Sequence, residues 1–293
     1  MDVSVIIVNY NTKSLIKDCI QSILDQTKGI EYEIIVVDNN SIDGSQDMIK
    51  KHFSNVILIE SKENLGFGKA NNLGSNIAKG KYLFYLNSDT ILSNNALRIF
   101  YDYAEQSKLP IGALGCILKG TNGDNCHSYG NFITIKSELK NSLGRYLRFL
   151  KDSDHLNPPS IDSIKDVDYI TGADLFVPKS VYDSIGGFDP IFFMYCEEAD
   201  WEFRMEENGL KRFIIPGPEI VHLEGGSDPS KSHIWSANRL KNFYRSKRIY
   251  MRKHNSYPKY ISYRFLYLML QIPINLTLAL TKRGDYISLL KHL

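Results

Sequence analysis

Four runs of mostly apolar residues constrain the fold of this chain more than any other feature. The runs are VSVIIV, YEIIVVD, NVILIE and YLFYLN, at residues 3–8, 32–38, 55–60 and 82–87. Unbroken runs of this length are typical of strands buried on both faces of a parallel sheet. Helical segments separate them, as at residues 15–24, where apolar side chains recur on one helical face. The alternation predicts an α/β fold, with an open, mostly parallel sheet and helices on both faces.

Polar residues follow three of these runs at the point where each predicted strand ends. The three corners are residues 9–11, 38–41 and 87–89. Ligands of such sheets bind beyond the carboxyl ends of the strands, so we expect a ligand site there. Asn71 stands where a GxGxxG fingerprint needs its third glycine, and the sequence has no GxxxxGK[ST] motif. These two absences exclude the dinucleotide fingerprint and the P-loop.

Several residues in these corners admit a functional and a structural role. Asp38 could accept from a base or a ribose hydroxyl, or it could organise its own turn. Asp89 suits a hard divalent cation that also binds substrate phosphates, although Asn-Ser-Asp is a common turn sequence. Glu197 and Glu198 begin a predicted helix, where they could act as a general base or complement the helix dipole. His222 precedes two glycines and could be a ligand or a structural histidine.

The C-terminal part of the chain is strongly basic. Residues 229–284 hold twelve Lys or Arg and no Asp or Glu, in a chain whose net charge is +2. Such a segment favours a polyanionic partner. Residues 263–280 are mostly apolar but are interrupted by Gln271, Pro273 and Asn275, which favours helices that lie on a membrane over one that spans it. No nucleic-acid module accompanies the charge, so we expect no nucleic-acid partner.

The expected partner of this segment is therefore an anionic membrane surface, in contact with residues 235–280. The bases expected to make this contact are Arg245, Lys247, Arg248, Arg252 and Lys253.

Seven segments, in this order, carry a family resemblance: VSVIIVNYN, IIVVDNNSIDGS, ENLGFGKANN, YLNSDT, TGADLFVPKSVYDSIGGFD, FFMYCEEADWEFRMEENG and VHLEGGS. Together they resemble the inverting family 2 glycosyltransferases of the rhamnosyltransferase or galactofuranosyltransferase-like type. The resemblance implies a GT-A fold. It also implies that a sugar passes from a nucleoside diphosphate to an acceptor hydroxyl with inversion, assisted by Mn²⁺ or Mg²⁺.

The resemblance further implies which residues hold the donor. Val8, through its backbone, Tyr10 and Asp38 would hold the base and the ribose. Asn64 and Asn72, in ENLGFGKANN, would lie near the nucleotide and its diphosphate.

The remaining implied roles concern the metal and the catalytic base. Asp89 is the last position of the family's DXD motif and would bind the cation, with His222 as a further ligand. Asn87 fills the first position of that motif, near the nucleotide sugar. Because Asn87 replaces an acid, a catalytically inactive relative that only binds a nucleotide sugar is the alternative. Glu198 matches the catalytic base of the family's ED motif, and Glu197 is the fallback base.

We expect a catalytic domain at residues 1–228, made of a nucleotide-sugar-binding half, 1–118, and an acceptor half, 119–228. We expect irregular structure at residues 119–166 and a basic, aromatic helical extension at residues 229–293. The N-terminus shows no signal peptide. These features predict a cytoplasmic enzyme at the inner face of the plasma membrane. Its acceptor would be a carbohydrate or lipid-linked, as in bacterial-type polysaccharide or lipid-linked oligosaccharide synthesis.

Overall fold

The computed structural model describes residues 1–148, 161–223 and 237–280. In this part of the chain the main sheet has eight strands, in the order β3-β2-β1-β4-β10-β6-β11-β8. Strands β3, β2, β1 and β4 are parallel to one another, and β10 runs antiparallel between β4 and β6. The expected mostly parallel sheet is confirmed. The strand bounds are β1 Val3–Asn9, β2 Tyr32–Asp38, β3 Ile57–Glu60, β4 Tyr82–Asn87, β6 Ile111–Gly115, β8 Lys165–Val167, β10 Asp174–Pro178 and β11 Lys211–Ile214.

Two small antiparallel pairs accompany the main sheet. One joins β5 (Thr90–Leu92) to β12 (Ile220–His222), and the other joins β7 (Tyr129–Gly130) to β9 (Tyr169–Ile170). The first pair matters for function because it brings the segment after β4 next to His222.

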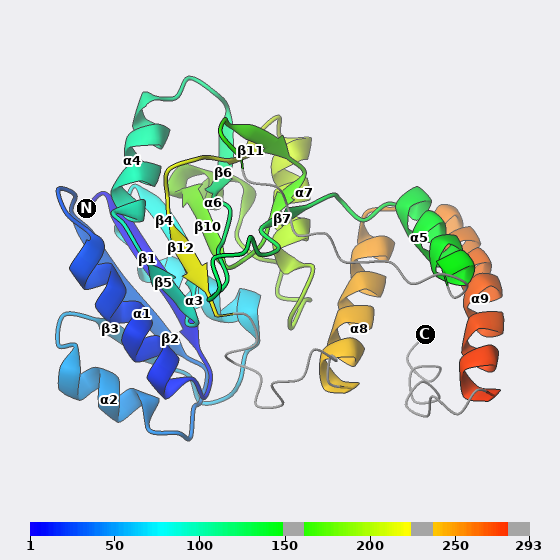
Figure 1. Cartoon of the computed structure of the whole chain (residues 1–293), viewed down its shortest axis with the longest axis horizontal. Coiled ribbons are helices and arrows are strands. Elements are labelled where there is room, and N and C mark those ends of the chain that lie inside the picture. The colour runs from blue at the N-terminus through cyan, green and yellow to red at the C-terminus, as the bar shows by residue number, and fades with distance from the viewer. Residues whose placement is uncertain (149–160, 224–236, 281–293) are drawn as a thin grey trace. The chain divides into compact units, whose positions relative to one another are not determined.

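Helices cover both faces of the main sheet, as Figure 1 shows. The helix bounds are α1 Lys13–Gln26, α2 Ser45–His52, α3 Phe67–Ile77, α4 Ala96–Gln106, α5 Ile135–Arg148, α6 Lys179–Ile185, α7 Glu197–Glu207, α8 Ala237–Lys253 and α9 Tyr257–Leu280.

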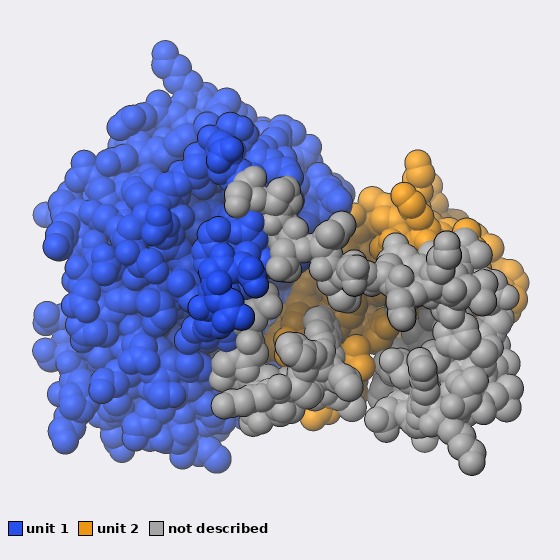
Figure 2. Space-filling view, viewed as in Figure 1, with its two compact units in different colours: residues 1–131, 157–193, 197–232 blue, residues 132–156, 194–196, 233–293 orange. Residues whose placement is uncertain are grey.

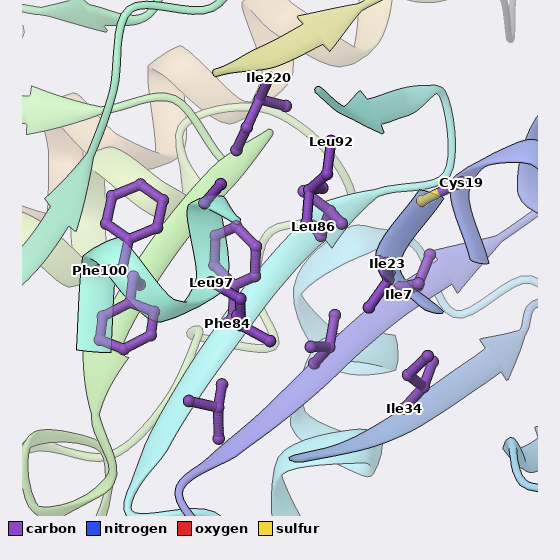
Figure 3. Packing of buried hydrophobic residues seen from close by; sticks show 14 of the residues in the cluster. Ile7, Cys19, Ile23, Ile34, Phe84, Leu86, Leu92, Leu97, Phe100 and Ile220 are labelled. Carbon is purple, nitrogen blue, oxygen red and sulfur yellow. The ribbon is translucent and has the colours of Figure 1, made fainter. Parts of the chain in front are cut away.

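The alternation of side chains along the strands builds two apolar clusters. Val5 and Ile7 of β1 join the cluster under α1, α2 and α4, part of which Figure 3 shows. Ile6 points to the opposite face and joins the cluster that contains Trp201 and Met205 of α7. Both clusters are closed to water, so the carboxyl edge of the sheet rests on a rigid base.

The chain forms two compact units, coloured in Figure 2. Unit 1 consists of Met1–Asn131, Asn157–Phe193 and Glu197–Ser232, and unit 2 of Phe132–Leu156, Met194–Cys196 and His233–Leu293. These units divide the chain differently from the expected boundary at residue 228, because a stretch of the expected acceptor half groups with the C-terminal helices.

The expectation of irregular structure over residues 119–166 is wrong, because α5 lies within it. Thr134 and Ser137 cap this helix reciprocally: the Ser137 N–H donates to Thr134 Oγ1 at 3.0 Å, and the Thr134 N–H donates to Ser137 Oγ at 2.9 Å. Within unit 2, α5 packs against α9.

Lys247 was expected to contact a membrane, and this expectation is also wrong. Its side chain is buried, and its ammonium donates to Glu138 Oε2 of α5 at 2.6 Å. The rings of Phe243, Tyr244 and Tyr267 lie 5.1 to 5.6 Å from the same ammonium. A lysine enclosed in this way ties α5, α8 and α9 together and is not available to lipid.

In the part of the chain that the structure describes, no helix combines the length and the apolar character needed to cross a membrane.

Candidate functional site

The carboxyl ends of β1, β2 and β4 are joined by a chain of side-chain hydrogen bonds. The Asn9 amide donates to Asp38 Oδ2 at 2.6 Å. Thr12 Oγ1 donates to Asn9 Oδ1 at 2.6 Å and lies 3.0 Å from Ser88 Oγ. The three polar corners predicted from the sequence therefore meet at one edge of the sheet.

Asp38 is fully buried at the end of β2. Besides Asn9, it accepts hydrogen bonds on Oδ1 from the Ser41 N–H at 2.8 Å and the Gln46 amide at 2.7 Å. Three donors fix this carboxylate, so it organises the corner. At the end of β1, Val8 is half-buried and Tyr10 is exposed, which leaves both accessible to a ligand. Contact of Val8, Tyr10 and Asp38 with a nucleotide stays a prediction.

The loop before α3 is fastened by two asparagines. Asn64 Oδ1 accepts the Gly66 N–H at 2.9 Å. Asn39 donates to the Gly66 carbonyl at 3.0 Å and accepts the Leu65 N–H at 3.3 Å. The sequence reading missed Asn39 as a positioning residue, although its place directly after the end of β2 marked it.

Gly66 sits where this loop meets the segment before α7. Its φ is +80°, and a Cβ there would overlap the Phe193 carbonyl. That carbonyl accepts the Phe67 N–H at 2.9 Å. We expect Gly66→Ala to lower the free energy of unfolding by roughly 2–4 kcal/mol, because it adds a backbone overlap to an unfavourable φ. Chemical denaturation followed by circular dichroism measures this.

Gly123→Ala is the matched control. Gly123 has the same φ of +80° but nothing within 4 Å of its Cβ position. Gly123→Ala should lower the free energy of unfolding by only about 1 kcal/mol, because it adds an unfavourable φ without an overlap. Equal losses in the two variants would show that the close approach to Phe193 does not matter.

Asn72 lies on α3 and is committed to the protein backbone. Its amide donates to the Phe188 carbonyl at 2.7 Å, and its Oδ1 accepts the Phe188 N–H at 3.0 Å. Both ends of the amide are thus used to hold the segment that leads to α7. Its expected place near the diphosphate stays a prediction, and the geometry gives it a structural role.

Asp89 and His222 are brought together by the pairing of β5 with β12. Asp89 Oδ1 lies 3.3 Å from His222 Nε2. The pairing places His222 opposite Thr90, and the Leu223 N–H donates to the Asp89 carbonyl at 2.9 Å. Asn87, at the end of β4, is half-buried.

The pair offers one carboxylate and one imidazole to a cation. Among the described residues, no group of three or more His, Cys, Asp or Glu side chains is arranged to hold a metal ion. Mg²⁺ commonly takes one or two carboxylates from the protein and completes its shell with substrate phosphates and water. Asp89 and His222 fit a cation of that kind, and do not fit a site built from protein ligands alone.

Glu197 and Glu198 open α7 in different surroundings. Glu197 is buried, and its Cβ lies 3.6 Å from the Cβ position of Gly68 in α3. Glu198 is half-buried as a whole residue, but its Oε2 is buried and accepts no hydrogen bond from the residues that the structure describes. Burial raises the pKa of Glu198 to about 7. A carboxylate with such a pKa is suited to accept a proton near neutral pH, which favours Glu198 as the base.

The residues of α7 that follow these two acids anchor the helix. Trp201 is fully buried, with its ring centroid 4.7 Å from that of Phe188. Asp200 pairs with Arg204 at 3.1 Å. The Arg204 guanidinium also donates to the Gly187 carbonyl at 2.6 Å. A base must keep its place during the reaction, and this anchoring provides it.

Two further buried acids lie close to the site. Asp174 opens β10 and accepts the Cys116 N–H at 2.7 Å, and burial raises its pKa to about 7. Glu202, one turn after Glu198, accepts the Ile170 N–H at 2.9 Å, and burial raises its pKa well above the usual value. The charge of His222 lowers the pKa of Asp174, and the charges of Glu198 and Asp174 raise that of Glu202.

These effects link His222 to Asp174, and both Asp174 and Glu198 to Glu202. The sequence analysis did not single out Asp174, although an acid directly before the apolar run LFV was a visible anomaly.

Known proteins are similar to this chain in sequence and in fold. Poly(ribitol-phosphate) beta-glucosyltransferase of Bacillus spizizenii is 38% identical over 130 residues, which are 42% of this chain and only 20% of that protein. N-acetylglucosaminyl-diphospho-decaprenol L-rhamnosyltransferase of Mycobacterium tuberculosis is 26% identical over 222 residues, 69% of this chain and 70% of that protein.

A solved structure has a similar fold. The mannosyltransferase PcManGT of Pyrobaculum calidifontis, in complex with GDP-Man and Mn²⁺, matches with a TM-score of 0.57 and 14% identity. The match covers 99% of this chain and 78% of that one, and it supports the expected GT-A fold. The sequence profile described as Glycosyl transferase family 2 matches residues 4–159, more than half of the chain. This chain therefore belongs to glycosyl transferase family 2.

Proposed function

We propose that this chain transfers a sugar from a nucleoside diphosphate to an acceptor hydroxyl, with inversion and with help from Mn²⁺ or Mg²⁺. The observation that carries the proposal is the presence of two features in unit 1. One is a carboxylate, Glu198, whose pKa is raised to about 7, and the other is the Asp89–His222 pair. A proton acceptor and a cation site are the two parts that this reaction needs.

In the proposed reaction, Glu198 takes the proton of the acceptor hydroxyl as its oxygen attacks the anomeric carbon. The bond to the diphosphate breaks on the opposite face, so the configuration inverts. Asp89 and His222 would hold the cation, which neutralises the charge that develops on the leaving diphosphate. Trp201 and Arg204 keep Glu198 in place through their anchoring of α7.

The donor would lie along the carboxyl edge of the sheet. Val8 and Tyr10 are accessible there, and Asp38 fixes the corner between them and the loop that contains Asn64. Asn87, half-buried at the end of β4, would face the sugar or the diphosphate.

The acceptor is proposed to be a carbohydrate or a lipid-linked sugar, in the synthesis of a cell-surface polysaccharide. The names of the relatives support this, since one acts on poly(ribitol phosphate) and another on a diphospho-decaprenol. The basic unit 2 would bring the enzyme to an anionic membrane at its cytoplasmic face.

The second candidate function is that of an inactive relative that binds a nucleotide sugar without turnover. Asn87 favours it, because the first acid of the metal motif is missing. Turnover with any acceptor excludes it.

A thermal-shift panel of UDP, dTDP, GDP and CMP, each with Mn²⁺, Mg²⁺ or EDTA, tests the proposal. We expect one nucleotide to raise the melting temperature only when a divalent cation is present. At 100 times its dissociation constant, a ligand adds about 2.7 kcal/mol to the free energy of unfolding. Stabilisation that persists in EDTA would contradict the metal-assisted site, and no stabilisation by any of the four would contradict donor binding.

A further inference from the structure

Helix α8 holds two of the three residues that come directly before α7. Within unit 2, Ser246 Oγ donates to the Met194 carbonyl at 2.7 Å. Arg239 Nε donates to Tyr195 Oη at 3.1 Å, and the Phe243 ring packs edge-on against Tyr195 with centroids 6.0 Å apart. Arg239, Phe243 and Ser246 follow one another at i, i+4 and i+7, so one face of α8 makes all three contacts.

The segment held in this way has an unusual backbone. Tyr195 has φ +70° and Cys196 has φ +64°, so two successive residues with side chains adopt the left-handed conformation. This conformation is unfavourable for such residues and persists only where their surroundings impose it. The next residue along the chain is Glu197, the first of α7, and Glu198 follows. The segment that α8 contacts is therefore directly continuous in the chain with the helix that carries the proposed base.

Another face of α8 is basic and exposed. Lys241, Arg245, Arg248 and Arg252 recur at i, i+4, i+7 and i+11, and all four are exposed. No ion pair joins any of them to an acid among the residues that the structure describes. An unpaired row of positive charge on a helix fits an anionic surface.

Helix α9 indicates that this surface is a lipid. Its side chains Ile261, Phe265 and Met269 are exposed and recur every four residues, so they form an apolar stripe along the helix. Exposed apolar side chains together with exposed basic residues are typical of helices that lie in a membrane interface. The phosphate backbone of a nucleic acid offers no apolar surface against which this stripe could pack.

We infer that α8 couples binding of an anionic lipid surface to the placement of the catalytic carboxylates. Arg245 and Arg248 contact the lipid, while Ser246 and Arg239, on the other face, hold Met194 and Tyr195 at the start of the left-handed segment. Ser246 and Arg239 are positioning residues. The lipid part of this inference rests on the proposed function, in which the membrane presents the acceptor.

Hydrogen exchange of the full chain, read by mass spectrometry with and without phosphatidylglycerol vesicles, tests the coupling. In the wild type, vesicles should slow exchange both in α8 and in residues 194–198. In Ser246→Ala and in Tyr195→Phe, vesicles should still slow exchange in α8. The slowing that vesicles cause in residues 194–198 should be about fivefold smaller than in the wild type, because each variant loses one hydrogen bond. A merely structural role would change exchange of 194–198 equally with and without vesicles.

The charge variant Arg245→Gln/Arg248→Gln separates binding from coupling. It should no longer co-sediment with phosphatidylglycerol vesicles, and vesicles should then leave residues 194–198 unchanged. Phosphatidylcholine vesicles should have no effect on any form. Failure of the wild type to co-sediment overturns both the membrane role and the coupling. If the wild type binds vesicles but exchange in residues 194–198 does not slow, the coupling alone is overturned. Neither result bears on the proposal of sugar transfer.

Discussion

A Glu198→Gln variant should turn over its donor with a kcat lower by roughly 10²–10⁴-fold, the usual contribution of a positioned general base. Glutamine has the same shape but cannot accept the proton of the acceptor hydroxyl. Glu198 lies on a helix anchored by Trp201 and by the contacts of Arg204, so the substitution leaves the frame intact. The measurement is steady-state kinetics with the sugar derivative of the nucleotide that stabilises the chain in the thermal-shift panel.

The control for this variant is donor binding. The nucleotide should still raise the melting temperature of Glu198→Gln by the wild-type amount, because Glu198 is not proposed to touch the nucleotide. A kcat near that of the wild type, together with a large loss in Glu197→Gln, would assign the base to Glu197 instead.

The same carboxylate predicts how activity depends on pH. Only the deprotonated form of Glu198 can act as a base, and burial raises its pKa to about 7. We therefore expect kcat/KM to fall as the pH is lowered through about 7, well above the usual range of a glutamate. A profile that is flat from pH 8 to pH 5 would contradict Glu198 as the base.

An Asp89→Ala variant should lose the stabilisation by nucleotide and cation, about 2.7 kcal/mol at 100 times the wild-type dissociation constant. Asp89 supplies the carboxylate of the proposed cation site, and only His222, 3.3 Å away, would remain as a ligand. The kcat should fall by roughly 10²–10³-fold, as when other electrostatic stabilisation of a leaving group is removed. The thermal-shift panel and the kinetic assay measure the two effects.

Asp183→Ala is the matched control for the loss of a carboxylate. Asp183 is exposed and pairs with Lys179 on the surface of α6. This variant should keep the full cation-dependent shift. If Asp89→Ala keeps it as well, the cation is held elsewhere and the assignment of Asp89 is wrong.

The strands at the centre of the sheet could be predicted because their signal is local. VSVIIV and YEIIVVD are largely buried on both faces, so most of their positions are apolar and the run itself indicates the strand. The same holds for the corners: Asn9 and Asp38 follow strands directly, and parallel strands bring their ends together.

Unit 2 could not be predicted in the same way. Helix α5 repeats apolar residues at Ile135, Leu139, Leu143 and Leu147, a signal that the expectation of irregular structure overlooked. Its buried Glu138, however, is stabilised by Lys247, 109 positions away. Lys247 looked like another surface base because nothing near it in the sequence reveals three aromatic rings around its ammonium. Contacts of this kind depend on the assembled helices, and a local pattern does not contain them.

Some residues of the candidate site could be predicted from the sequence and others could not. Asp89 and His222 are joined by a strand pairing that no spacing in the sequence announces, yet the resemblance named both. Asn39 and Asp174 escaped notice because their importance comes from the backbone groups that they hold, Gly66 and Cys116. The commitment of Asn72 to Phe188 likewise became visible only in the fold.

The reversed direction of β10 has a consequence for how this architecture can diversify. Because β6 ends and β10 begins at the same edge of the sheet, the connection between them leaves and returns on the side where the ligand site lies. Its length is nearly free, since doubling a flexible loop costs only about 0.6 kcal/mol of closure entropy. Insertions and deletions in this connection can therefore accumulate over generations without disturbing strand register, provided that they spare β7, α5, β8 and β9. The proposed donor-binding half and the segment that would meet new acceptors would then evolve at different speeds.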